Sequence, residues 1–222
     1  MEWDIRRTQL AKTLSFDVSV YRELRHDPRA TLPALAVPIL AMFGFGLGGF
    51  LWFVVEMEGS WEFFWKSAIV GSLLGLVFWF VWMGVVYLLL GHVDGERMEP
   101  SEFGRVMAPA SAPLLLGFFM FIPEINFGVG LVAVGLLFTS CVLAAQHGLG
   151  ASPQKAVWAN LAGFAIWAAV LPMIVTTENP FAPGIFVFDW TGDIMVNIYN
   201  AFKQISEEFG GGIGQFEQFI GE

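Results

Sequence analysis

The stretch SAIVGSLLGLVFWFVWMGVVYLLLGHV, residues 67–93, contains 27 residues without one Asp, Glu, Lys or Arg. A helix that spans the hydrocarbon core of a bilayer needs about 20 mainly apolar residues. Lipid offers no partner to an unpaired backbone amide, so an isolated spanning segment keeps its hydrogen bonds internal by forming a helix. The stretch therefore predicts a transmembrane helix.

Four further stretches also lack every charged residue type. They cover residues 30–55, 106–123, 125–154 and 156–177, and contain 26, 18, 30 and 22 residues. The composition of the 222-residue chain agrees, since 56% is hydrophobic and only 14% is charged, against about 25% charged in an ordinary soluble domain. The sequence predicts an all-α, polytopic integral membrane protein with five transmembrane helices.

Polar segments on both sides of this apolar part define three regions. Residues 1–31 form an amphipathic N-terminal segment, residues 32–175 the five-helix transmembrane domain, and residues 176–222 a polar tail. Within the first region, Ser19 to Arg25 predicts a short helix that ends at Asp27-Pro28. The tail carries an apolar stripe at helical spacing, which we expect to dock on a partner subunit. Its members are Trp190, Ile194, Ile198, Phe202, Ile205 and Phe209.

The basic residues predict the orientation of the five spans. Nine of the eleven Lys and Arg residues precede the first span or lie in the loops after the second and fourth, and only Lys66 and Lys203 lie on the opposite side. Short loops rich in Lys and Arg stay in the cytoplasm. We therefore expect a cytoplasmic N-terminus and a C-terminus outside. On the predicted inner side, Asp and Glu equal Lys and Arg in number, so this side carries no net positive charge. That argues against a nucleic-acid partner.

Small residues and prolines inside the spans predict how the helices pack. Two pairs of glycines lie four residues apart, a spacing that lets another backbone approach closely. Two prolines, also four apart, lie near the inner end of the third span, where they favour a kink or an unwound entry. These helix-packing and kink positions are Gly44, Gly48, Gly71, Gly75, Pro109 and Pro113.

The spans offer little for chemistry. The three histidines, His26, His92 and His147, fall at the predicted inner boundary, where convergent imidazoles would suit zinc or haem. No pair has the close helical spacing of a metal motif, and no span contains a carboxylate. The serines within the spans have no partner base. We expect no catalytic residues and no metal or other cofactor, with His92 and His147 as the remaining cofactor-binding candidates.

Three loop segments resemble the prokaryotic members of the Yip (Ypt/Rab-interacting protein) membrane family. They read VYRELRHDPR at residues 20–29, GHVDGER at 91–97 followed by SEFGRV at 101–106, and HGLGASPQKA at 147–156. The resemblance implies a five-helix integral protein of the plasma membrane without a known catalytic site. Eukaryotic relatives bind small GTPases in membrane traffic, but no GTPase-contacting residue carries over to this chain.

Together these features predict a non-enzymatic membrane scaffold or an accessory subunit of a larger assembly, with the lipid bilayer and other membrane subunits as partners. A transport pathway or an intramembrane active site usually needs ionisable groups at depth, and the spans contain almost none. The alternative is a small-solute or lipid transporter that uses the proline-containing third span, because broken helices mark many transporter sites.

The uneven distribution of basic residues gives a direct test of topology. A reporter that is active only outside the cytoplasm, fused after Glu222, should be active, and the same reporter placed in the loop of residues 91–105 should be silent. Reporter activity in whole cells measures both. The opposite pattern would contradict the orientation and the five-span count together.

Overall fold

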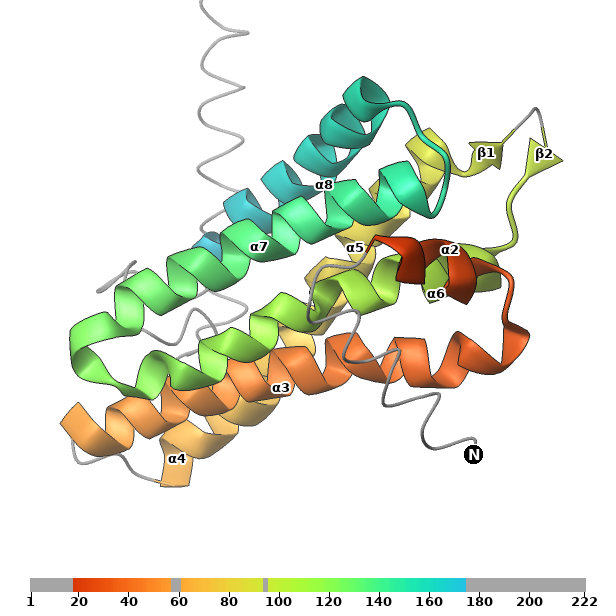
Figure 1. Ribbon diagram of the computed structural model, residues 1–222. Helices are drawn as coiled ribbons and strands as arrows, with labels where there is room; N and C mark the ends of the chain where they lie inside the picture. Colours follow the sequence, from red (N-terminus) through yellow and green to blue (C-terminus); the bar gives the residue numbers. More distant parts are fainter. Residues whose placement is uncertain (1–17, 57–60, 94–95, 175–222) are drawn as a thin grey trace, which may run out of the picture.

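The computed structural model describes residues 18–56, 61–93 and 96–174, and the following account is limited to these residues. They form a bundle of helices whose neighbours in sequence run in opposite directions (Figure 1). A two-residue antiparallel ladder between β1 (His92–Val93) and β2 (Glu96–Arg97) lies in a loop at one end of the bundle. The all-α prediction is therefore confirmed in its main feature.

The helices follow one another along the chain with short connections. The elements are α2 (Ser19–Arg25), η1 (Pro28–Ala30), α3 (Thr31–Glu56), α4 (Trp61–Phe63), η2 (Phe64–Gly71), α5 (Ser72–Leu90), α6 (Pro100–Met107), η3 (Ala108–Phe121), η4 (Pro123–Ile125), α7 (Asn126–His147) and α8 (Pro153–Ile174). The short helix predicted from Ser19 to Arg25 and its end at Asp27-Pro28 are confirmed.

Four helices are long and apolar enough to cross a membrane: Pro28–Val55, Phe64–Leu90, Pro100–Phe121 and Pro123–His147. The fifth predicted span falls on α8, a helix of 22 residues, or about 33 Å at 1.5 Å per residue. The count of five spans and the orientation of the two termini stay predictions.

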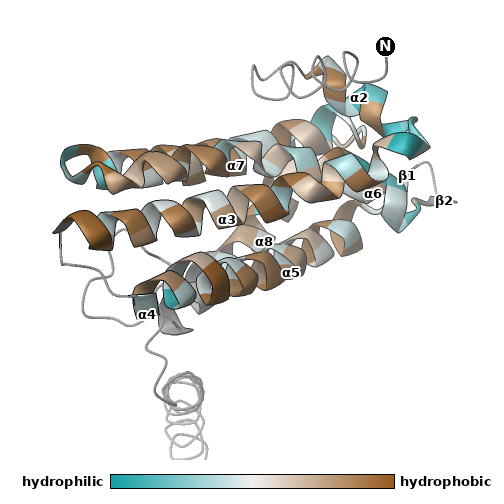
Figure 2. Cartoon of the chain, turned by 90° about the horizontal axis from the view of Figure 1, so that it is seen from below, coloured by the Kyte–Doolittle hydropathy of each residue, from teal (hydrophilic) through white to brown (hydrophobic). Residues whose placement is uncertain are grey.

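Large apolar side chains cover the outside of the bundle as well as its interior. Leu88 on α5, Leu131 on α7 and Trp158 on α8 each expose more than 60% of their surface. Figure 2 shows the bundle helices as mainly hydrophobic, with polar residues gathered around α2, β1 and β2. Such an extensive exposed apolar surface fits contact with lipid rather than with water.

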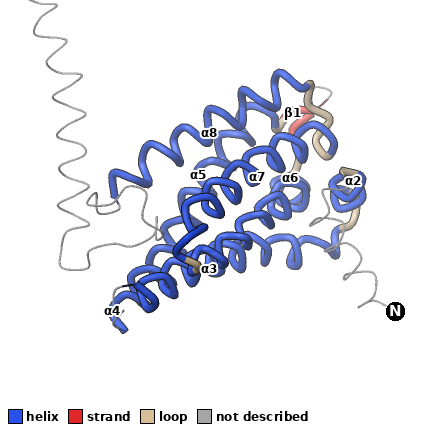
Figure 3. Tube along the Cα trace, turned by 60° about the vertical axis from the view of Figure 1, so that its left-hand side comes forward, coloured by secondary structure: helices blue, strands red, loops and turns tan. Residues whose placement is uncertain are grey.

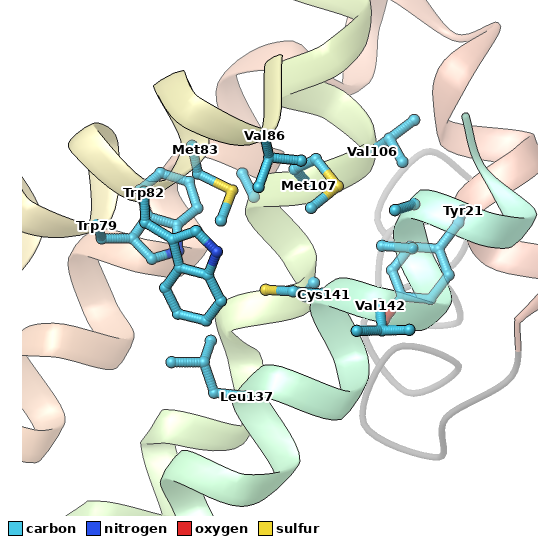
Figure 4. Packing of buried hydrophobic residues seen from close by; sticks show 14 of the residues in the cluster. Tyr21, Trp79, Trp82, Met83, Val86, Val106, Met107, Leu137, Cys141 and Val142 are labelled. Carbon is cyan, nitrogen blue, oxygen red and sulfur yellow. The ribbon is translucent and has the colours of Figure 1, made fainter. Parts of the chain in front are cut away.

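The principal helix contacts form a closed circuit around an apolar core. α3 packs on η3, η3 on α7, α7 on α8, α8 on α5, and α5 with η2 on α3. Figure 4 shows side chains from α5, α6 and α7 filling the interior, among them Trp79, Trp82, Met107 and Leu137. The third span is the most enclosed, with 72% of its apolar stretch buried against 33% for the second.

The third span changes helix type at its prolines. From Ala108 to Phe121 it is a 3-10 helix of 14 residues, which includes Pro109 and Pro113. The Ser111 hydroxyl donates to the Ala108 carbonyl oxygen at 2.7 Å. A 3-10 helix rises about 2.0 Å per residue, so these 14 residues extend about 28 Å instead of about 21 Å as an α-helix. The shortest uncharged stretch thereby approaches the thickness of the hydrocarbon core.

One face of α3 lies almost in contact with the backbone of η3. A methyl group on Gly48 would overlap the Gly117 carbonyl oxygen, and one on Gly117 would overlap the Phe45 ring. A methyl group on Gly44 would lie 3.3 Å from a methyl carbon of Leu115. The two backbones can approach this closely only because neither Gly48 nor Gly117 carries a side chain.

Another face of α3 packs against η2 and the start of α5 about as closely as the first face packs against η3. A methyl group on Gly46 would lie 2.5 Å from the Ser72 hydroxyl oxygen. The Ser67 hydroxyl donates to the Gly46 carbonyl oxygen at 2.7 Å, and the Ser72 hydroxyl donates to that of Met42 at 3.0 Å. Hydrogen bonds between helices of this kind contribute on the order of 0.6 kcal/mol each in membrane proteins. Gly71 and Gly75, which the sequence predicts as helix-packing positions, are both buried.

Aromatic rings gather at the end of the bundle where α3 meets α4. Phe53 stacks on Phe63 at 4.6 Å between ring centroids, and Trp61 stacks on Phe64 at 4.7 Å. Trp61 is 68% exposed. Tryptophan concentrates at the boundary between lipid and water, so this end of the bundle has the composition of a membrane interface.

The contrast between enclosed and open glycines gives a stability test. Gly48→Ala should lower the free energy of unfolding by about 1–3 kcal/mol, because the new methyl group meets backbone atoms that cannot rotate away. Gly84→Ala on α5 is the matched control, since nothing lies within 4 Å of a methyl group there. The control should be neutral or slightly stabilising, because alanine favours a helix over glycine. Unfolding in mixed micelles measures the free energy for both variants. If the two substitutions changed it equally, the close approach of the α3 and η3 backbones would be contradicted.

Candidate functional site

Polar residues concentrate at the end of the bundle that carries α2 and the β1–β2 ladder (Figure 2). The loop between α7 and α8 lies at the same end (Figure 3). α2 packs against α6 and α7 at this end. Its buried side chains are Val20, Tyr21 and Leu24, while Arg22 and Glu23 are exposed. The spacing of the buried residues gives a seven-residue helix one apolar face, which it presents to the bundle.

Arg105 on α6 connects α2 and α3 to this end of the bundle. The side chain is 6% exposed. Its Nε and Nη2 atoms donate to the Arg25 carbonyl oxygen at 3.2 and 3.0 Å, and Nη1 donates to the Thr31 hydroxyl oxygen at 3.2 Å. The guanidinium group therefore satisfies a free carbonyl at the C-terminus of α2, where the helix dipole favours a cation.

A second contact joins the C-terminus of α2 to the start of the α7–α8 loop. Arg25 Nη1 donates to the Gly148 carbonyl oxygen at 3.4 Å. A methyl group on Gly148 would overlap a methyl carbon of Val106 and lie 3.1 Å from the Tyr21 Cβ. Glycine is therefore required for α2, α6 and the end of α7 to meet at this point.

Tyr21 reaches from α2 towards the part of α7 that carries Cys141 and Val142 (Figure 4). The side chain is 2% exposed. Burial raises the pKa of the Tyr21 phenol above its ordinary value; the nearby Cys141 thiol adds to this shift and the Ser140 hydroxyl opposes it. The phenol is therefore neutral at physiological pH, as its apolar surroundings require.

One buried polar atom near this part of α7, the Asn160 Oδ1 atom, has no hydrogen-bond partner within the described part of the chain. The amide nitrogen of Asn160 is fixed, since it donates to the Ala156 carbonyl oxygen at 2.9 Å and to that of Cys141 at 3.5 Å. The bond to Ala156 lies within α8, and the bond to Cys141 links α8 to α7, as expected for a polar residue within a span.

Of the three histidines proposed from the sequence, the structure describes the side chains of two. His26 caps α2 and is exposed, His147 ends α7 and is partly buried, and His92 lies in β1 with a side chain that the structure does not describe. Among the described residues, no group of three or more His, Cys, Asp or Glu side chains is placed to hold a metal. The tail residues Trp190, Ile194, Ile198, Phe202, Ile205 and Phe209 lie outside the described residues.

No pattern in the sequence marks Arg105 or Tyr21 as a structural anchor. Arg105 directly precedes the third uncharged stretch, which reads as an ordinary solvated boundary residue. Tyr21 lies within the predicted helix from Ser19 to Arg25, but nothing in the sequence indicates which helices its side chain meets. In both cases the missing information is the position of α2 against α6 and α7.

Comparison with known protein families, with curated proteins and with solved structures found no match to this chain. The resemblance to the Yip family therefore stays a prediction that depends on the loop motifs alone. The polar contacts described here hold neighbouring helices together.

Removing the Arg105 guanidinium tests its role in anchoring α2. Arg105→Gln should cost about 2–4 kcal/mol of unfolding free energy, because hydrogen bonds from a charged donor contribute about 1.5–3 kcal/mol each and are not additive. Arg22→Gln, on the exposed face of α2, should stay within about 0.5 kcal/mol of the unaltered protein. Unfolding followed by tryptophan fluorescence measures both. Equal stability of the two variants would exclude Arg105 as an anchor.

Proposed function

We propose that this protein is a non-enzymatic membrane scaffold or an accessory subunit of a larger membrane assembly. The observation that carries the proposal is the use of polar side chains within the spans. Ser67, Ser72 and Asn160 each donate to the backbone of a neighbouring helix. Polar groups that hold helices together in this way support a fixed bundle rather than a site for chemistry.

The wider setting of this proposal follows from the sequence. The basic loops favour a cytoplasmic N-terminus and an external C-terminus, and the Yip-like loop motifs favour the plasma membrane of a prokaryote. The bilayer and other membrane subunits are the proposed partners. The apolar stripe of the tail, from Ile194 to Phe209, is the proposed docking element.

A transporter for a small solute or lipid is the second candidate, and the third span favours it. η3 is a 14-residue 3-10 helix at the most enclosed position of the bundle. Runs of 3-10 helix longer than three or four residues are uncommon, and within a longer helix they often mark a functional hinge. An enclosed helix that can change its length would suit a transporter whose binding site opens alternately to the two sides of the membrane.

Proline substitution separates the two candidates. A Pro109→Ala, Pro113→Ala double variant should let η3 approach α-helical geometry, shorten the third span and weaken its packing on α3 and α7. The scaffold proposal expects a loss of stability and of the proteins that co-purify in mild detergent. Pro33→Ala is the matched control, because Pro33 is exposed in the first turn of α3, where proline is readily tolerated or replaced.

Co-purification from the native membrane, with quantitative mass spectrometry, gives the readout. The scaffold proposal expects a stoichiometric membrane partner that persists in Pro33→Ala and is depleted in the double variant. If the double variant keeps its fold and its partners but loses uptake or efflux of a defined solute in cells, the transporter candidate replaces the scaffold.

A further inference from the structure

We propose that Arg22, Arg25 and Lys155 bind the headgroup of an anionic phospholipid at the end of the bundle that carries α2. The site is independent of the proposed scaffold function. In the predicted orientation this end of the bundle faces the cytoplasmic leaflet, where anionic phospholipids give the membrane its negative surface potential.

The three cations have no carboxylate partner within the described part of the chain. Arg22 and Lys155 are exposed and make no hydrogen bond or ion pair there. The half-buried guanidinium group of Arg25 makes one hydrogen bond, from Nη1 to the Gly148 carbonyl oxygen at 3.4 Å, and its Nε atom has no partner. A guanidinium group has five N–H donors in a fork that matches phosphate. Positive charge and hydrogen-bonding capacity are therefore left over at this end.

The fold brings these cations to one corner of the bundle. At 3.6 residues per turn, Arg25 lies at one edge of the buried face of α2 with Arg22 beside it, and Glu23 lies at the other edge. The hydrogen bond from Arg25 to Gly148 joins the first edge to the α7–α8 loop. Lys155 follows this loop, in the first turn of α8. The cations therefore surround the loop, while the carboxylate of α2 lies on the far side of the helix.

Arg105 holds Arg25 in this position. Its Nε and Nη2 atoms donate to the Arg25 carbonyl oxygen at 3.2 and 3.0 Å. Because Arg105 is 6% exposed, it is a positioning residue and not a contact for the lipid. Its hydrogen bonds go to uncharged oxygen atoms, and a buried charge is screened less than an exposed one. Arg105 therefore adds to the attraction for an anion at this corner.

Exposed apolar side chains place the cations at the level of the lipid headgroups. Trp158 follows Lys155 by three residues, so the two side chains share one face of α8. Trp158 is 69% exposed, and Leu32 at the start of α3 is 81% exposed. Tryptophan concentrates at the boundary between lipid and water. Lys155 thus lies one helical turn from a residue suited to that boundary, on the side of the polar end of the bundle, where lipid phosphates are found.

Titration with defined lipids tests the site. In neutral detergent micelles, native mass spectrometry should show that phosphatidylglycerol binds the protein more tightly than phosphatidylcholine does. Arg22→Gln and Lys155→Gln should each weaken phosphatidylglycerol binding about fivefold, and the double variant about thirtyfold, as expected for one or two cations near an anionic surface. Neither side chain has a partner to lose in the described structure, so both variants should fold. Equal affinity of the double variant and the unaltered protein would overturn the proposal.

A substitution of equal charge separates a local site from a general effect of net charge. Lys203→Gln removes the same charge on the side of the membrane that the sequence predicts to be opposite, and it should keep the original affinity. Arg22→Lys keeps the charge and should retain most of the binding that Arg22→Gln loses. If Lys203→Gln weakened binding as much as Lys155→Gln, the attraction would follow net charge and the site would be excluded.

Two further measurements identify the source of the phosphate. Inorganic phosphate at the same concentration should not displace phosphatidylglycerol; displacement would assign the site to free phosphate and overturn the lipid. Lipids that co-purify from the native membrane should be enriched in anionic phospholipid relative to the bulk membrane, and the double variant should lose this enrichment. Enrichment that persists in the double variant would contradict the site, whatever happens to the partner subunits.

Discussion

The near contact between the backbone of α3 and its neighbours on two faces is the constraint on which the rest of the bundle depends. At Gly48 the space for a side chain is taken by η3, and at Gly46 it is taken by Ser72 and the Ser67 backbone. In lipid, the hydrophobic effect does not distinguish a neighbouring helix from an acyl chain, so association depends on close packing and hydrogen bonds. The glycines of α3 permit both.

The 3-10 geometry of η3 follows from the same constraint and from chain length. The third uncharged stretch has 18 residues, or about 27 Å as an α-helix, which is short for a core of about 30 Å. Pro113 has no N–H to donate to the Pro109 carbonyl and its ring would clash with that carbonyl in an α-helix. A 3-10 helix is longer per residue, so it lets this stretch cover the distance while it packs against α3 and α7.

Much of the fold follows from one-dimensional patterns. The uncharged stretches located the long helices, and the amphipathic N-terminal segment predicted α2 at Ser19–Arg25. These features depend on local composition and on the cost of unpaired backbone in lipid. The glycine spacing identified one face of α3, and Gly48 lies where it meets η3.

What the sequence did not show depends on contacts between distant residues. The prolines indicated where α-helix would fail, but the 3-10 conformation continues eight residues beyond Pro113 to Phe121, because the approach of Gly117 to Gly48 and Phe45 is a tertiary property. The π-helix of η2 has no proline or other local signal. Helix propensity is a weak influence that packing overrides.

The end of the bundle at α2 shows how a buried charge is accommodated without a carboxylate. The Arg105 guanidinium binds the Arg25 carbonyl and the Thr31 hydroxyl, and removing a charge from water is tolerated only when its donors are well paired. The carbonyl belongs to the C-terminus of a helix, whose dipole offers part of a negative charge. Arg105 therefore gains stability only while α2 is docked, and α2 keeps its last turn capped only while Arg105 is present. This mutual dependence links the N-terminal helix directly to the third span.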